Sequence, residues 1–254
     1  MAGLLEGKVG LVTGAAGGIG RGIAVELGRE GAVVLVSDLE SEAERAQETV
    51  SLVEQAGGTA LWQACDVTSA EANDALVARL VREHGRLDYA VNNAGVAVHK
   101  ELVEVTDAEY DRVLDINLKG VFLGMRSQIR QMVAQGSGSI VNMASVAGLT
   151  GVRDIGVYTA SKHGIVGLTK NTAMEYGERG IRVNAVCPNA IRTPLMDISP
   201  PDFVEALIAP QAIKRPGEVE EVGAPVAFLL SDKASFITGV ALPIDGGYMT
   251  TAYV

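Results

Sequence analysis

The sequence predicts an α/β fold in which seven parallel strands form one doubly wound sheet with helices on both faces. Short apolar runs alternate with longer helical patterns along all 254 residues, and strands that alternate with helices pair in parallel through right-handed crossovers. The strand runs are apolar almost throughout, as expected where both faces of a sheet are covered. Neither a repeat nor a linker interrupts this alternation, so residues 1–254 are expected to form a single domain.

The predicted elements follow one another at an even pace. Ser41, Ser69 and Asp107 precede helical stretches as expected N-caps, and Glu44, three residues after Ser41, indicates a capping box. The predicted strands span residues 9–12, 32–37, 60–64, 89–92, 139–143, 182–186 and 240–244. The predicted helices span residues 19–30, 41–56, 70–84, 107–135, 157–177 and 218–230.

The charge balance is acidic, with 21 Lys and Arg against 31 Asp and Glu and a net charge of −10. Such a surface repels phosphate backbones and anionic lipid, so neither nucleic acid nor a membrane is an expected partner. We expect a cytoplasmic protein, because no apolar run approaches the ~18 residues of a membrane span and no secretory signal is evident. Cys65 and Cys187 are expected as unpaired buried thiols. His84, His99 and His163 lack acidic or thiol partners at ligand spacing, so no metal site is predicted.

A glycine cluster follows the first predicted strand. Gly14, Gly18 and Gly20 occupy the pattern Thr-Gly-x-x-x-Gly-x-Gly that begins at Thr13. Absent side chains let the backbone approach phosphate, and the N-terminus of the next helix attracts an anion. Glycines also serve ordinary turns. The position after the first strand, with an acid at the end of the second, favours a dinucleotide site.

The acid that ends the second strand is Asp38. A carboxylate at this point can accept hydrogen bonds from both ribose hydroxyls of a dinucleotide. It would also repel the 2′-phosphate of NADP. Asp38 therefore predicts NAD as the cofactor, the alternative being an acid in a surface loop.

Tyr158 and Lys162 lie four residues apart in a helical pattern, so they share a helix face. Ser145 follows the strand predicted at 139–143, at the sheet edge where open α/β folds bind ligands. The ordinary pKa of a phenol, ~10, is too high for a base near neutrality, but nearby cations lower it. We predict Tyr158 as general base in alcohol oxidation and general acid in ketone reduction. Ser145 would hydrogen-bond the substrate oxygen, and Lys162 would supply one cation, with oxidised nicotinamide as the second.

These motifs, together with Asn-Asn-Ala-Gly at residues 92–95, resemble those of the short-chain dehydrogenase/reductase family over nearly the whole chain. The resemblance implies a single-domain Rossmann fold and an NAD-dependent enzyme that interconverts a secondary alcohol and a ketone. It further implies that Asn117 belongs to the catalytic group, its side chain helping to hold a water that links Lys162 to solvent.

The resemblance also implies where the dinucleotide lies. Asp66 would accept from the adenine amino group beside Val67, although it could instead cap the following helix. Gly17 and Leu39 occupy the two places where NADP-preferring relatives often carry a basic residue. The residues expected to contact the cofactor are Gly14, Gly18, Ile19, Gly20, Asp38, Leu39, Asp66, Val67, Asn93, Gly95, Tyr158, Lys162, Pro188, Ile191 and Thr193.

Residues 188–216 contain six of the eight prolines and are expected to form a substrate loop over the site. Relatives usually have glycine after Pro188, where this chain has Asn189. Asparagine tolerates the left-handed conformation better than most residues, and its side chain would project near the substrate. The predicted substrate-binding residues are Ser145, Val152, Ile155, Tyr158 and Asn189. The wider candidate wall is Val96, Val146, Leu149, Val152, Ile155, Leu195, Met196 and Phe203.

This apolar wall lacks a basic cluster, which favours a hydrophobic or cyclic secondary alcohol and its ketone as the small-molecule substrate. Two alternatives stay open: an NADPH-linked 3-oxoacyl-(acyl-carrier) ketoreductase, which Asp38 disfavours, and a non-catalytic dinucleotide sensor, which tends to lose the tyrosine or the lysine. The resemblance also implies a homotetramer built through two helices that carry small residues, the alternative being packing within one chain. These residues are Gly120, Gly124, Gly164 and Gly167.

Overall fold

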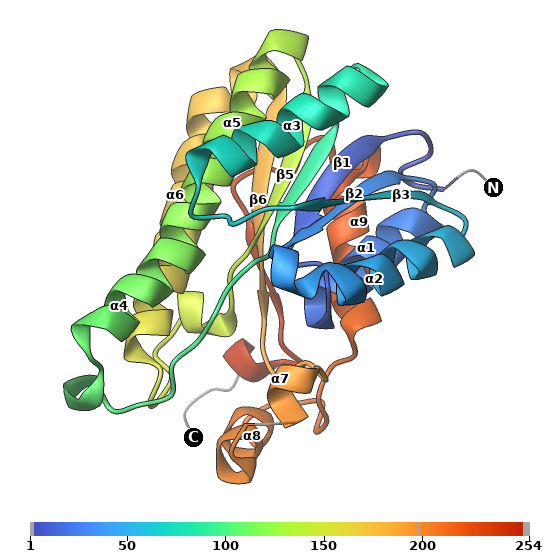
Figure 1. Ribbon diagram of the computed structural model, residues 1–254. Helices are drawn as coiled ribbons and strands as arrows, with labels where there is room; N and C mark the ends of the chain where they lie inside the picture. The colour runs from blue at the N-terminus through green and yellow to red at the C-terminus, as the bar shows by residue number, and fades with distance from the viewer. Residues whose placement is uncertain (1–2, 198, 251–254) are drawn as a thin grey trace.

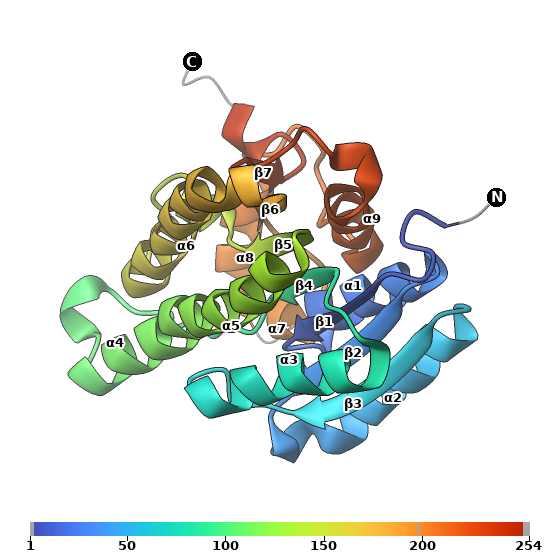
Figure 2. The same cartoon turned by 90° about the horizontal axis from the view of Figure 1, so that it is seen from above.

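Seven parallel strands form a single sheet in the order β3-β2-β1-β4-β5-β6-β7 (Figures 1 and 2). The structure is a computed structural model that describes residues 3–197 and 199–250, apart from the side chain of Leu195. All seven predicted strands are present, and the predicted doubly wound α/β fold is confirmed. The strands are β1 (Val9–Thr13), β2 (Val33–Asp38), β3 (Thr59–Ala64), β4 (Tyr89–Asn92), β5 (Gly138–Met143), β6 (Ile181–Pro188) and β7 (Ala241–Ile244).

Helices cover both faces of this sheet (Figure 2). One layer consists of α1 (Gly18–Arg29), α2 (Ala43–Gln55) and α9 (Val219–Leu230). The opposite layer consists of α3 (Ala70–His84), α5 (Gly120–Gln135) and α6 (Gly156–Tyr176).

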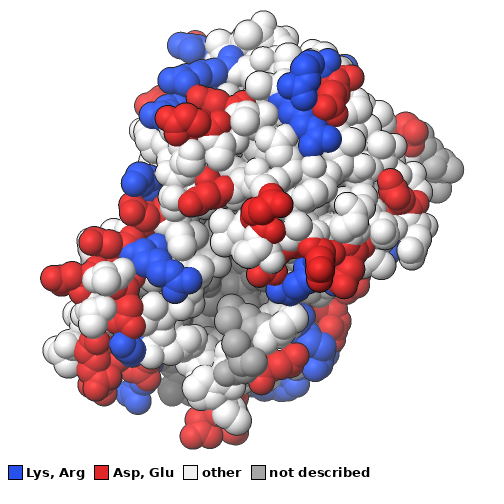
Figure 3. All heavy atoms as spheres, in the orientation of Figure 1, with Lys and Arg blue, Asp and Glu red and all other residues white. Residues whose placement is uncertain are grey.

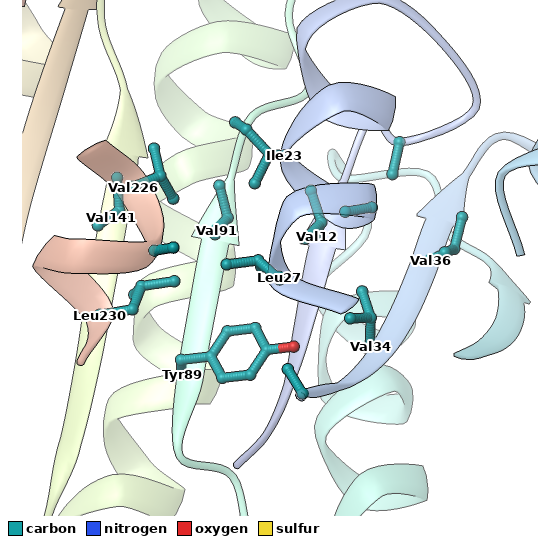
Figure 4. Close-up of a cluster of buried hydrophobic side chains, with 14 of the residues drawn as sticks. Val12, Ile23, Leu27, Val34, Val36, Tyr89, Val91, Val141, Val226 and Leu230 are labelled. Carbon is teal, nitrogen blue, oxygen red and sulfur yellow. The ribbon is translucent and has the colours of Figure 1, made fainter. Parts of the chain in front are cut away.

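Strand side chains feed two separate apolar cores because successive residues point to opposite faces. Val12 and Val91 pack with Leu27 of α1 in the core of the first layer (Figure 4). The neighbouring Leu11 belongs to the core of the second layer. Cys187, like the other cysteine, is buried and unpaired, as predicted.

The long helix predicted over residues 107–135 is interrupted in its middle. It consists of α4 (Asp107–Leu114), a π-helical turn (Asp115–Lys119) and α5. Single π turns inside α-helices occur often at functional sites. The hydrophobic pattern continues through this turn, so periodicity alone did not reveal it. The turn carries Asn117, whose side chain is fully buried.

Two of the three predicted helix caps are wrong. A short 3₁₀ turn (Glu40–Glu42) precedes α2, so Ser41 and Glu44 form no capping box. Before α4, Thr106 rather than Asp107 is the N-cap, and it forms a capping box with Glu109. The cap of α3 is confirmed, since Ser69 accepts a hydrogen bond from the amide of Ala72 at 3.1 Å.

The proline-rich segment 188–216 is more regular than a loop. It contains the short helices α7 (Pro194–Asp197) and α8 (Pro201–Ile208), each beginning at a proline. Proline breaks a helix interior but suits the first turn, because its missing N–H has no helical partner there. In Figure 1 both helices lie at the bottom of the view, beyond the carboxyl edge of the sheet.

Three of the four small residues expected at a subunit contact make close contacts inside the chain. A Cβ on Gly120 would lie 2.9 Å from Val67, one on Gly124 would lie 2.7 Å from Asn92, and Gly164 meets Leu118 in the same way. These glycines let α5 pack closely on Val67 and Asn92, and α6 on Leu118 of the π turn. Gly167 has nothing of its own chain within 4 Å of that position.

Acidic and basic side chains occur together on the face of the molecule in Figure 3. On the face in Figure 3 the described Lys and Arg side chains are scattered among Asp and Glu and form no continuous basic strip of the kind that binds phosphate backbones. None of the helices in the described part of the chain combines the length and apolar character that a membrane span requires.

Candidate active site

A crevice of about 710 Å³ opens at the carboxyl edge of the sheet, where β1 lies between β2 and β4. This is the point where the strand order reverses, and open α/β sheets bind ligands there. Of the predicted cofactor residues, Ile191 alone does not line it and lies instead in an adjoining pocket. The crevice brings together Gly14, Gly18, Ile19, Gly20, Asp38, Leu39, Asp66, Val67, Asn93, Gly95, Tyr158, Lys162, Pro188 and Thr193.

Backbone geometry requires glycine at each motif position. Gly14 and Gly18 have φ of +65° and +53°, a region that side chains disfavour. A Cβ on Gly20 would clash with the carbonyl oxygen of Gly14 and would lie 2.5 Å from the side-chain Nδ2 of Asn93. No side chain caps the start of α1, so its first N–H groups stay available to an anion. The loop therefore fits a dinucleotide pyrophosphate.

Asp38 is held firmly at the end of β2. Its carboxylate accepts hydrogen bonds from the amides of Ala16 at 3.0 Å and Leu39 at 2.9 Å. Arg45, which sequence reasoning missed, also lines this end of the crevice and lies beside Gly17. Its guanidinium pairs with Glu42 at 2.9 Å. Its place depends on how α2 packs beside α1, which spacing along the sequence does not reveal.

Side chains at the ends of β3 and β4 shape the middle of the crevice. Asp66 accepts from the amide and the hydroxyl of Thr68 at 2.9 and 2.8 Å, so it orders the turn before α3 but does not cap that helix. Asn93 donates to the carbonyls of Thr13 and Gly14, both at 3.0 Å, and ties β4 to β1. Asn92 likewise donates to a β5 side chain at 2.9 Å.

Ser145, Tyr158 and Lys162 come together in the crevice as predicted. Ser145 follows β5, while the other two lie on one face of α6. The Lys162 ammonium lies 5.3 Å from the centre of the Tyr158 ring and donates to the carbonyl of Met143 at 2.8 Å. Ser145 accepts from the amide of Ala147 at 3.2 Å.

Burial controls the proton affinities of this group. Burial raises the pKa of Tyr158, and a hydrogen bond with Ser145 opposes that effect. Burial lowers the pKa of Lys162 to about 8. Without a cofactor, the protein's own groups therefore raise the pKa of Tyr158 and keep it protonated at neutral pH. The expected lowering of this pKa by Lys162 is not seen.

The π turn places Asn117 close to Lys162. Its side-chain amide donates to the carbonyl of Val96 at 2.9 Å and to the hydroxyl of Ser161 at 3.1 Å, and its oxygen accepts from the amide of Val96 at 2.8 Å. Ser161 in turn donates to the carbonyl of Tyr158 at 2.7 Å. Both amide hydrogens are thus used within the protein, and the side chain braces the loop after β4 against α6.

A second, mainly apolar pocket of about 180 Å³ adjoins the crevice. Of the predicted wall, Val96 lines the crevice instead, Leu149 packs in a core, and the Leu195 side chain lies outside the described residues. His99 and Leu207, which the sequence analysis did not assign to the site, also line the pocket. The predicted residues found there are Ser145, Val146, Val152, Ile155, Tyr158, Asn189, Met196 and Phe203.

Asn189 lines both the crevice and the pocket, so its predicted position near the substrate space agrees with the structure. Its backbone is not left-handed, because Asp154 is the single non-glycine residue with positive φ among those described. The expected left-handed turn is therefore wrong. The side-chain amide of Asn189 donates to the carbonyl of Leu207 at 2.9 Å and links the end of β6 to α8.

Comparison with known proteins places the chain in a family. Residues 14–249 match the family model described as "Enoyl-(Acyl carrier protein) reductase". Levodione reductase of Leifsonia aquatica is 42% identical over 94% of this chain and 93% of its own length. Cyclohexanol dehydrogenase of Acinetobacter sp. strain SE19 is also 42% identical, over 98% and 97%. The 3-oxoacyl-[acyl-carrier-protein] reductase FabG of Thermotoga maritima is 39% identical over 96% and 98%.

Solved structures of similar proteins share the fold of this chain. Levodione reductase superimposes with a TM-score of 0.92 at 39% identity, covering 98% of this chain and 100% of that one. NAD⁺-bound xylitol dehydrogenase gives 0.90 at 36% identity over 96% and 99%. An Agrobacterium tumefaciens protein with bound NADP gives 0.88 at 32% identity over 97% and 98%. With its glycine loop and its Ser145, Tyr158 and Lys162 gathered in one crevice, the chain belongs to the short-chain dehydrogenase/reductase family of oxidoreductases.

Proposed function

We propose that this protein is an NAD-dependent oxidoreductase that interconverts a secondary alcohol and a ketone on a small ring. One observation carries the proposal: Ser145 and Tyr158 line both the dinucleotide crevice and the apolar pocket. A substrate in the pocket would therefore meet the cofactor beside these two side chains.

The roles follow from chemistry at named atoms. Bound NAD would supply the hydride acceptor. The Tyr158 oxygen takes the hydroxyl proton in oxidation and returns it in reduction. The Ser145 hydroxyl hydrogen-bonds the substrate oxygen and fixes its position. Lys162 would hold ribose hydroxyls of the bound dinucleotide, and together with the positive charge of NAD⁺ it would stabilise the phenolate, while Asn117 positions the loop that borders the lysine.

The preference for NAD rests on Asp38. Known structural neighbours contain either NAD⁺ or NADP, so they do not decide this point. Arg45 is the nearby cation, but its ion pair with Glu42 leaves the Asp38 carboxylate as the uncompensated charge. A 2′-phosphate would meet net repulsion there.

Pocket size favours a substrate with a single ring. About 180 Å³ is small against the ~300–1,000 Å³ typical of ligand pockets. A relative at 42% identity is named cyclohexanol dehydrogenase. The acyl-carrier ketoreductase is the second candidate because FabG is a relative, yet no Lys or Arg occurs among the described residues that line the pocket. We place the substrate loop at residues 188–216, whose helices supply Met196 and Phe203 to the wall.

A panel of substrates with NAD and NADP tests the proposal. We expect reduction of NAD with cyclohexanol and with other small cyclic secondary alcohols, followed by absorbance of the reduced cofactor. Preference for 3-oxoacyl thioesters with NADPH, or for free sugars, would contradict it. Tight NAD binding without turnover of any alcohol or ketone would favour a dinucleotide sensor.

We also propose a homotetramer, with α5 and α6 at one contact. Phe122 of α5 is 44% exposed and lines a surface hollow with Leu118 and Leu168, which a second copy of the chain would cover. Light scattering is expected to give four times the mass of the chain. Phe122→Glu should reduce that mass, because a charge would be buried at the contact. A monomeric wild-type protein would contradict the assignment.

A further inference from the structure

Some residues of the apolar pocket are shared with the dinucleotide crevice, and others are not. Ser145, Tyr158 and Asn189 line both the pocket and the dinucleotide crevice, so they define the end at which chemistry occurs. His99 and Phe203 line the pocket but not the crevice. They therefore belong to the part of the pocket outside the crevice, called its far end below.

Few polar side chains occur at this far end. Among the described residues that line the pocket alone, the polar ones are His99 and Ser199. Ser199 already interacts within the protein. No residue in the described part of the chain hydrogen-bonds to either ring nitrogen of His99, whereas the remaining far-end side chains are apolar.

The imidazole of His99 is held in place before any substrate enters. Its ring packs nearly perpendicular to Phe203 of α8, with centroids 4.3 Å apart and planes at 89°. The next residue, Lys100, donates its amide to the carbonyl of Asp154 at 2.8 Å and forms an isolated bridge with Ile155. A ring that packs on Phe203 and is carried by a backbone held at Lys100 loses less freedom when it binds a ligand than a free side chain would.

The protonation state of His99 selects the kind of group it can bind. His99 stays exposed to solvent at the pocket, yet its partial burial lowers the pKa of the imidazole from the ordinary value, and the Asp154 carboxylate opposes that shift. The ring is therefore neutral at pH 7, with one donor nitrogen and one acceptor nitrogen. Such a ring suits an uncharged oxygen, either a hydroxyl that donates or a carbonyl that accepts.

We propose that His99 is a specificity-determining residue that hydrogen-bonds a second, uncharged oxygen on the substrate ring, across the ring from the reacting carbon. The inference rests on the proposed function and narrows it. The expected substrates are ring compounds with two oxygens on opposite sides, such as a cyclic diol, hydroxyketone or diketone. An apolar pocket would otherwise favour an alkyl substituent at that position.

The test compares cyclohexane-1,4-diol with 4-methylcyclohexanol, each isomer assayed separately with NAD, and uses plain cyclohexanol as reference. We expect the wild-type kcat/KM to favour the diol about tenfold, which corresponds to about 1.4 kcal/mol. His99→Phe keeps the ring that packs on Phe203 but removes both nitrogens. It should abolish the preference for the diol over 4-methylcyclohexanol.

Two further variants complete the experiment. His99→Asn retains an amide donor and acceptor and should keep part of the preference. His84→Phe, at the exposed end of α3, is the matched control and should change nothing. A preference unchanged in His99→Phe, or absent from the wild type while cyclohexanol is oxidised, would overturn the role of His99 alone. Failure of the wild type to oxidise any of the three alcohols would contradict the proposed function and with it this inference.

Discussion

Replacement of Tyr158 by phenylalanine is expected to lower kcat for alcohol oxidation by about 10²- to 10⁴-fold, the usual contribution of a general acid or base. The variant loses the phenol oxygen but keeps the ring beside Lys162. The glycine loop and Asp38 lie on other elements, so the affinity for NAD should stay within about twofold. Turnover is measured by absorbance of the reduced cofactor, and binding by calorimetry.

Tyr176 offers a matched control for this substitution. It lies on the same helix, α6, but its ring packs against Arg179 at 5.2 Å and does not line the crevice. Tyr176→Phe should leave kcat within about twofold. If Tyr158→Phe retained kcat within tenfold of the wild type, the tyrosine would not be the group that transfers the proton.

The wild-type protein is expected to use NAD at least about 10²-fold more efficiently than NADP. A penalty of about 3 kcal/mol for a phosphate beside the Asp38 carboxylate corresponds to that ratio of kcat/KM values. Asp38→Asn removes the charge and keeps one oxygen, which can accept from the amide of Ala16 or of Leu39 but not from both, because each amide donates to a different carboxylate oxygen. It should reduce the preference at least about tenfold.

Asp74→Asn, on α3 outside the crevice, is the control for the loss of one negative charge. It should leave the preference unchanged. Glu42→Gln should move the ratio in the same direction as Asp38→Asn, because it releases Arg45 from its ion pair. Equal use of both cofactors by the wild type, or an unchanged ratio in Asp38→Asn, would show that Asp38 does not select the cofactor.

Local sequence patterns were enough to predict the sheet and most of the crevice. All strands are short apolar runs, and in a parallel sheet their carboxyl ends meet at one edge. The position of Asp38 therefore followed from its place at the end of the second strand, whereas that of Asn93 came from the family resemblance. The glycine loop was also predictable, because its glycine spacing is visible in the sequence. The structure agrees, since Gly20 has no room for a side chain.

Features that depend on packing between elements could not be predicted. The π turn at Asn117 continues the apolar periodicity of the helix around it. Arg45 and His99 reach the site from an exposed helix and a loop, and neither stands in a motif. The helices α7 and α8 were missed because their prolines occupy first turns, where proline is compatible with a helix.

The phenol of Tyr158 provides the most direct measurement. Ultraviolet difference titration of the wild type against Tyr158→Phe isolates this one tyrosine from the six in the chain. Without NAD⁺ we predict that its pKa lies above the ordinary ~10, because burial raises it. With saturating NAD⁺ the added positive charge beside Lys162 should bring the pKa below ~10. A tyrosinate signal that forms above pH ~10 both with and without NAD⁺ would contradict a proton transfer through Tyr158.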